Sequence, residues 1–275
     1  VHEGVPQGVA LDIQQSASLF RFDTRVTGDT DPAAMRGSDL VIITAGFPRK
    51  PGMSRSDVLE ANLGIIDGIV DNMLDYAPDA MLMMVTNPVD VLTWHAFTRT
   101  GWPRERVFGQ SGALDTARMT AFIALETGYS VKDISALVLG GHGDAMVPLP
   151  RFTDISGINI EHFLDAEKIE QIAERTRQGA GELLPLQHRT HAYASLAAAI
   201  AAMVDAIGHN RRRILPCVAV LDGEYGQKSL AMGVPAVLDE RGLTGIIELK
   251  LDASEKAEFR KSADMVHSDI SNLPA

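Results

Sequence analysis

The sequence of 275 residues has a single cysteine, few aromatic residues and less positive than negative charge. The one cysteine, Cys217, excludes an intrachain disulfide framework and fits a reducing cytoplasm, where we expect the protein to reside. The formal net charge of −11 argues against nucleic acid and anionic membranes as partners. Any site that binds an anion must therefore be a local pocket.

Long apolar runs are missing as well. The longest apolar-rich stretch, 192–204, is too short to span a bilayer, and no basic segment followed by an apolar run indicates a secretory signal. Cys217 lies in a shorter apolar run, 214–220, of the kind that forms buried strands. We therefore expect a core thiol there, with a nucleophile as the alternative.

The chain does contain an alternation of apolar runs with helical spacing. Runs at 39–44 and 80–85 predict buried strands, and apolar residues three or four apart predict an amphipathic helix over 55–76. The remaining elements predicted for this half are helices over 6–20 and about 88–100, a strand at 23–26 and a helical turn at 32–36. This alternation favours right-handed βαβ units and a parallel sheet.

The pattern changes in the second half of the chain. Short strands are predicted at 136–139, 214–221 and 234–238, and long helices over 167–183 and 193–207. We therefore predict an α/β fold in two domains, with the parallel sheet in residues 1–113 and an α+β substrate domain in residues 114–275.

A loop with two prolines and a glycine follows the strand at 39–44 and carries Arg49 and Arg55. Open α/β sheets bind ligands at the carboxyl ends of their strands. Because guanidinium groups grip carboxylates and phosphates through paired hydrogen bonds, the loop predicts an anionic substrate. A merely solvated basic loop is the alternative.

Three other polar positions accompany this loop. Asn87 ends the strand at 80–85, either as a ligand contact or as a helix N-cap before Pro88. Asp115 and Arg118 share one face of a helix running to about Thr127, and an ordinary surface ion pair is the alternative for them.

His142 is the third position, and it lies among glycines after an apolar strand. Such a turn is open to a ligand, and histidine titrates near neutrality, although a tight turn with an incidental histidine is the alternative. Together, Asp115 would orient His142, and His142 would exchange a proton with a carbinol or carbonyl oxygen. A redox reaction at such a site needs a separate hydride carrier, because no protein side chain supplies hydride.

These motifs closely resemble the malate/lactate dehydrogenase family, in order and over essentially the whole chain. The matching motifs are Thr44-Ala45-Gly46, the loop from Arg49 to Arg55, Asn62, Thr86-Asn87-Pro88, Leu114-Asp115-Thr116-Ala117-Arg118 and the stretch from Gly140 to Pro148. The branch that the chain resembles is the lactate-dehydrogenase-like malate enzymes of bacteria. The resemblance implies a Rossmann-type dinucleotide-binding domain, NAD as cofactor, no metal and a homodimer or homotetramer.

The resemblance also implies roles for individual residues. His142 matches the catalytic histidine, Asp115 its carboxylate partner and Arg118 the clamp on the substrate carboxylate. Arg55 matches the arginine that polarises the carbonyl, and Arg49 matches the position that selects a second carboxylate, which favours oxaloacetate over pyruvate. The remaining implied contacts, to the cofactor and in part to the substrate, are Ala45, Gly46, Asn62, Val85, Thr86 and Asn87.

Two features depart from the family pattern. No glycine-rich phosphate loop follows a first strand, so we expect a fragment that lacks about 30 residues, the size of an opening βαβ unit. His191 stands where a small residue usually lines the pocket. The expected function is interconversion of malate and oxaloacetate. The alternatives are a lactate-type or other 2-hydroxyacid dehydrogenase, or an inactive fragment that retains only subunit contacts.

Overall fold

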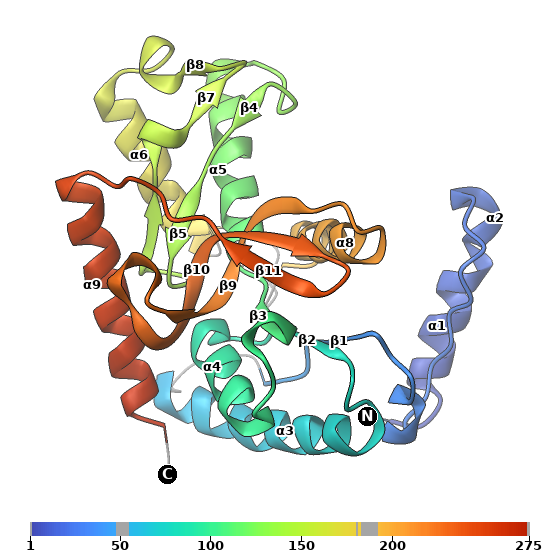
Figure 1. Ribbon diagram of the computed structural model, residues 1–275. Coiled ribbons are helices and arrows are strands. Elements are labelled where there is room, and N and C mark those ends of the chain that lie inside the picture. The colour runs from blue at the N-terminus through green and yellow to red at the C-terminus, as the bar shows by residue number, and fades with distance from the viewer. Residues whose placement is uncertain (1, 48–54, 180, 183–191, 274–275) are drawn as a thin grey trace.

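The computed structural model of the protein describes residues 2–47, 55–179, 181–182 and 192–273. A large mixed sheet, a small sheet and the surrounding helices make up this part of the chain (Figure 1). The helices are α1 (Val5–Gln15), α2 (Ala17–Phe20), α3 (Arg55–Tyr76), α4 (Val89–Thr100), α5 (Gly112–Thr127), α6 (Ala166–Arg177), α8 (Ala194–Gly208) and α9 (Ala253–Ser271). None of these helices is long and apolar enough to cross a membrane.

The strands of the large sheet follow the order β1-β2-β3-β9-β10-β5-β6, with β11 paired to β10, and β4-β7-β8 form the small sheet. Their bounds are β1 (Leu40–Ile43), β2 (Met81–Met84), β3 (Val107–Gly109), β4 (Ile134–Ser135), β5 (Val138–Gly140), β6 (Met146–Pro148), β7 (Asp154–Ile155), β8 (Ile158–Asn159), β9 (Arg213–Asp222), β10 (Lys228–Asp239) and β11 (Gly242–Ile246). The predicted Rossmann-type parallel sheet is found at one end of this sheet, and an antiparallel part continues it.

The parallel part consists of β1, β2 and β3, linked by α3 and α4. Leu40 of β1 lies opposite Met81 of β2, and Leu82 of β2 lies opposite Val107 of β3. All four residues of β2 are buried, as expected for a strand covered on both faces. The apolar residues of α3 recur every three or four positions and pack against the sheet, among them Leu63, Ile66, Val70 and Met73. The predicted helix over 55–76 and the parallel pairing are both confirmed.

The predicted strand at 23–26 does not form. This segment is irregular, and the backbone N–H of Val26 donates to the side chain of Gln14 rather than to a neighbouring strand. β1 is the last strand on its side of the sheet among the described residues. A strand pattern needs a hydrogen-bonded neighbour to become a strand, and the segment has none.

The predicted helix over 6–20 is divided at Ser16 into α1 and α2. The hydroxyl of Ser16 donates to the carbonyl of Ile13, a local bond that competes with helix continuation. Both helices stand apart from the body of the molecule, on the side opposite α9 (Figure 1).

The antiparallel part is built on the long hairpin of β9 and β10. Cys217 lies opposite Val234 in this hairpin, and both are fully buried in the largest core cluster, where Met232 and Phe108 also pack. The expected core thiol is therefore confirmed. One backbone pair, Gly109 with Val218, joins this hairpin to β3.

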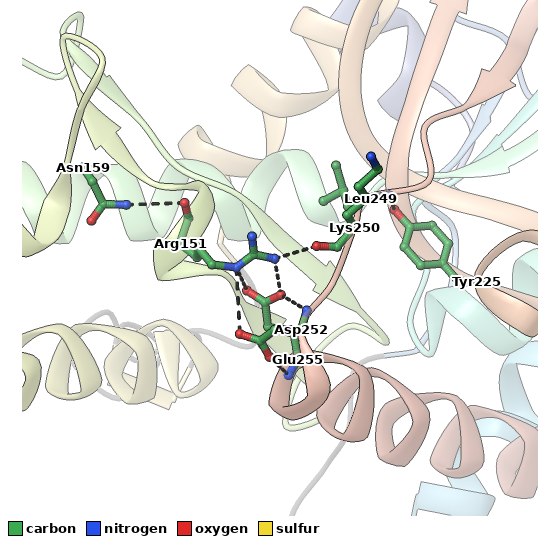
Figure 2. Close-up of polar contacts among 7 residues, drawn as sticks. All are labelled: Arg151, Asn159, Tyr225, Leu249, Lys250, Asp252 and Glu255. Carbon is green, nitrogen blue, oxygen red and sulfur yellow. Dashed lines mark hydrogen bonds and ion pairs between the residues drawn. The ribbon is translucent and has the colours of Figure 1, made fainter.

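Helix α9 is fixed at its first turn. Asp252 and Glu255 form a capping box, and Arg151 donates to both carboxylate oxygens of Glu255 at 3.0 and 2.6 Å and to the carbonyl of Lys250 at 2.7 Å. Figure 2 shows this cluster beside the Tyr225 hydroxyl, which accepts from the backbone N–H of Leu249. Because α9 packs on β5 and β6, these bonds hold it over the turn between the two strands.

Candidate active site

His142 lies in the tight turn between β5 and β6. Gly140 precedes it with φ of 87°, and a Cβ there would lie 2.8 Å from Ser262 Oγ and 2.9 Å from the carbonyl oxygen of Ala145. Only glycine fits this position without a shift of its neighbours. The N–H of Gly141 then donates to Ser262 Oγ at 2.9 Å, which ties the turn to α9.

The structure brings His142 together with Asp115, the partner that the sequence predicted. Nδ1 of His142 lies 2.8 Å from Oδ2 of Asp115, which stands on the first turn of α5 and is only 2% exposed. Since Nδ1 is engaged, Nε2 is the ring nitrogen left to exchange a proton with a ligand. The alternative of an incidental histidine in a turn does not account for this buried carboxylate.

Arg118 completes a row of three charged or titratable groups. Its Nη1 donates to Oδ1 of Asp115 at 3.0 Å, so Asp115 bridges Arg118 and His142. The side chains of Arg118 and Asp115 are 13% and 3% exposed, and the alternative of a surface ion pair is therefore wrong. No other hydrogen bond joins the Arg118 guanidinium to the described residues, which leaves donors for a carboxylate ligand.

The pKa of His142 lies above its ordinary value. Burial by itself lowers the pKa of the imidazole, but the carboxylate of Asp115 raises it through charge and a hydrogen bond, and Asp90 raises it further. The positive charge of Arg118 acts in the opposite direction. The net upward shift favours the imidazolium, the form that donates a proton.

Asp90 belongs to the same cluster, and the sequence reasoning missed it. Its Oδ2 accepts from the backbone N–H of His142 at 2.8 Å. Burial raises the pKa of Asp90 to about 6, against the effect of that hydrogen bond. The available signal was an acidic residue between the buried Val89 and Val91 of α4, three positions after Asn87.

The loops that follow β1 and β2 are held together by two polar side chains. Asn62 of α3 is 1% exposed; its Oδ1 accepts from Phe47 N–H at 2.7 Å, and its Nδ2 donates to the Asn87 carbonyl at 3.0 Å. The Thr86 hydroxyl donates to the Ala45 carbonyl at 2.7 Å. Both side chains therefore fix the backbone at the carboxyl edge of the parallel strands.

Asn87 itself is exposed at this edge. Its bond to Pro88 is cis, α4 begins at Val89, and no side chain caps that helix. The Asn87 side chain accepts only a long bond, 3.4 Å, from Val89 N–H. The predicted N-cap role is therefore wrong, and the amide is open to a ligand.

Three predicted positions cannot be placed in this arrangement. Arg49 and His191 lie outside the described residues, and of Arg55 only the backbone is described, as the first residue of α3. Their predicted roles stay predictions.

The carboxyl edge of the parallel strands suits a dinucleotide. Residues 44–47, which follow β1, are exposed. A Cβ on Gly46 would lie 2.6 Å from the Thr86 methyl group, so this position has no room for a side chain. Gln110, at the end of β3, has a buried Nε2 that finds no partner among the described residues. Open α/β sheets bind their ligands in the crevice at the carboxyl ends of the strands, and these residues lie at that edge.

Two family models match the chain. One is described as the lactate/malate dehydrogenase NAD-binding domain and matches residues 1–109. The other is described as the lactate/malate dehydrogenase alpha/beta C-terminal domain and matches residues 112–274. The first match implies NAD as the cofactor, in agreement with the sequence prediction.

Relatives at high identity carry the same family name. A malate dehydrogenase of Nitrosococcus oceani is 61% identical over 98% of this chain and 87% of its own length. One of Thioalkalivibrio sulfidiphilus is 58% identical over 99% of this chain and 89% of its own length. No comparison shows the predicted loss of an opening βαβ unit, and it stays a prediction.

The fold agrees with that of a solved relative. The structure of malate dehydrogenase from Salinibacter ruber superposes with a TM-score of 0.93 at 44% identity, over 98% of this chain and 86% of that chain. Sequence, domain order and fold thus point the same way, and the chain belongs to the lactate/malate dehydrogenase family.

Proposed function

We propose that the protein is an oxidoreductase that interconverts malate and oxaloacetate with NAD, and that His142 is its proton acid and base. The observation that carries this proposal is the buried row of His142, Asp115 and Arg118, with contacts of 2.8 and 3.0 Å. Malate dehydrogenases at 58% and 61% identity support the choice of substrate.

The proton passes through Nε2 of His142. In malate oxidation this nitrogen accepts the hydroxyl proton, and in oxaloacetate reduction it returns a proton to the carbonyl oxygen. Asp115 holds Nδ1, which orients the ring and stabilises the imidazolium. Bound NAD supplies the hydride acceptor, and NADH the donor, in this exchange.

The arginines bind and polarise the substrate. Asp115 orients the Arg118 guanidinium, whose remaining donors clamp the carboxylate beside the reacting carbon. Arg55 polarises the reacting carbonyl, Arg49 pairs with the second carboxylate, and the exposed Asn87 amide adds a hydrogen bond. The NAD contacts come from the edge formed by Ala45, Gly46, Asn62, Val85, Thr86 and Asn87, where Asn62 and Thr86 position the backbone.

One specificity assay tests this proposal against its alternatives. We expect the full protein to oxidise NADH with oxaloacetate far faster than with pyruvate, and Arg49→Gln to lose at least tenfold of that preference, because an unpaired charge in a closed pocket is costly. The control is Arg99→Gln, since Arg99 pairs with Asp71 on the surface of α3 and α4. Equal turnover of both substrates would favour the lactate-type alternative, and turnover of neither would favour the inactive one.

We further propose a homodimer or homotetramer located in the cytoplasm. The stretch Val9 to Phe20 keeps large apolar side chains 45–81% exposed: Val9, Leu11, Ile13, Leu19 and Phe20. An exposed apolar stripe of this kind is typical of subunit contacts, and the reduced thiol of Cys217 suits the cytoplasm. Light scattering after gel filtration should give two or four subunits, and fewer for Leu11→Glu; a monomeric parent protein would contradict the oligomer.

A further inference from the structure

The turn that carries His142 is held from three sides by three elements. Asp115 of α5 engages the ring of His142, Ser262 of α9 accepts from Gly141 N–H, and Asp90 of α4 accepts from His142 N–H at 2.8 Å. One histidine therefore has two carboxylate partners, one on its side chain and one on its backbone.

The charge of Asp90 is more than this backbone bond needs. Asp90 is 5% exposed, and its Oδ1 has no hydrogen-bond partner among the described residues. The hydroxyl of Thr93, one turn along the same helix, also lacks a partner there. Burying a carboxylate is costly, and the amide oxygen of an asparagine would accept the same N–H without that cost.

The balance of charge around His142 accounts for the carboxylate. The charged groups that act on His142 are Asp115 and Arg118 from α5 and Asp90 from α4. With Asp115 and Asp90 ionised and Arg118 positive, a neutral imidazole leaves one excess negative charge, and an imidazolium cancels it. The charge on Asp90 is the one that Arg118 does not already neutralise through a direct contact.

We propose that Asp90 is a positioning residue for His142: its carboxylate fixes the backbone of the turn, and its negative charge favours the protonated ring. This inference rests on the proposed function, because it concerns the same proton transfer. It also follows that the two groups titrate together. Protonation of Asp90 weakens the hold on the imidazolium, and a proton on His142 favours ionised Asp90.

The direct test is the titration of His142 followed by NMR of the imidazole carbons in the protein without cofactor, with the resonance assigned by its loss in His142→Gln. Asp90→Asn keeps an oxygen acceptor for the backbone bond and removes the charge. We expect the titration midpoint of His142 to fall by about one pH unit in this variant. An unchanged midpoint would overturn the proposal.

Ser262→Ala is the matched control, because it removes a different, uncharged support of the same turn. Its His142 midpoint should stay at the parent value. If Ser262→Ala lowers the midpoint as much as Asp90→Asn does, the effect comes from the geometry of the turn, and the charge of Asp90 has no such role.

A reciprocal measurement serves if Asp90→Asn does not fold. The NMR chemical shift of the side-chain carboxyl carbon of Asp90 should report a titration with a midpoint near pH 6 in the parent protein. This midpoint should rise in His142→Gln, where no imidazolium is present to favour the ionised form. A midpoint that His142→Gln leaves in place would contradict the coupling.

Kinetics separate this inference from the proposed function. If the parent protein reduces oxaloacetate, the pH above which kcat/KM declines should be lower in Asp90→Asn, while the KM for NADH stays the same. An active parent with an identical profile in Asp90→Asn would overturn the role of Asp90 alone. A parent protein without oxaloacetate reduction would overturn the proposed function, and the NMR titrations would still decide the coupling.

Discussion

At the scale of single residues, the proposed proton transfer makes the rate in each direction depend on the protonation state of His142. Asp115 and Asp90 raise the pKa of His142 against the opposing effect of burial. The ring therefore stays protonated at a higher pH than an ordinary histidine, whose pKa is 6.5. In the proposed mechanism, reduction of oxaloacetate needs the imidazolium, whereas oxidation of malate needs the neutral ring. The two directions should therefore respond oppositely to pH.

We expect kcat/KM for oxaloacetate reduction to fall as pH rises through the His142 pKa, and kcat/KM for malate oxidation to rise over the same range. The raised pKa of His142 also makes the free energy of unfolding depend on pH. This contribution to stability is fully present at a pH below the pKa of His142 in the unfolded chain, and it is lost as pH rises through the pKa in the folded protein. Initial rates in both directions across pH check the first statement, and parallel profiles would contradict it.

Asp115→Asn should lower both the rate and the pH range of reduction. The variant removes the largest contribution that raises the His142 pKa and the partner that orients Arg118. We expect a loss of about 10²-fold or more in kcat for oxaloacetate reduction, with the decline beginning at lower pH. Asp71→Asn, which breaks an exposed pair with Arg99, is the control and should keep the parent profile.

At the scale of elements, the turn between β5 and β6 depends more on Gly140 than on Gly143. Gly140 and Gly143 both have positive φ, but a Cβ would meet Ser262 Oγ and the Ala145 carbonyl only at Gly140, and nothing within 4 Å at Gly143. Alanine at either position would therefore strain the backbone, and at position 140 it would also clash with Ser262 and Ala145.

Gly140→Ala should destabilise the protein by about 1–3 kcal/mol from backbone conformation alone, with a further loss from the clash. Gly143→Ala should show only the conformational part. Urea unfolding of the two variants measures the difference, and equal losses would mean that Ser262 and Ala145 do not confine the turn.

How far the elements follow from sequence differs from case to case. The helix over 55–76 was predicted with its exact bounds, because its buried stripe has helical spacing and a Pro-containing break follows it. The strand at 23–26 was wrong, because pairing depends on a neighbour that local sequence does not reveal. Asp90 was missed because it contacts His142 across 52 positions of sequence, a proximity that only the folded chain creates.

At the scale of the whole molecule, β9 and β10 supply many of the buried residues of the antiparallel part, and Cys217 of β9 is one of them. Its thiol is fully buried, and burial raises its pKa to about 12. Both facts make the native thiol unreactive, because the thiolate is the nucleophile and reagents cannot reach it.

We expect Cys217 to react with a thiol reagent only when the molecule unfolds. Across a urea titration, the labelled fraction should follow the loss of circular dichroism. Rapid labelling of the native protein in the absence of urea would contradict the buried position of this hairpin.

The pairing of Asp115 with His142 was predictable at this scale, since the motifs that carry them identify the family and lie in the family order. The Asp115–His142 contact requires α5 and the β5–β6 turn to meet. In the structure, Oδ2 of Asp115 lies 2.8 Å from Nδ1 of His142. For Arg49 and Arg55 the sequence remains the source of the proposed roles.

The central claim is that His142 transfers the proton in a malate–oxaloacetate reaction, and one comparison tests it most directly. The kcat of oxaloacetate reduction is measured for the parent protein and for His142→Gln, with NADH binding followed by fluorescence in both. The account predicts a loss of about 10²–10⁴-fold in kcat with NADH binding retained. Turnover at the parent rate in His142→Gln would contradict it.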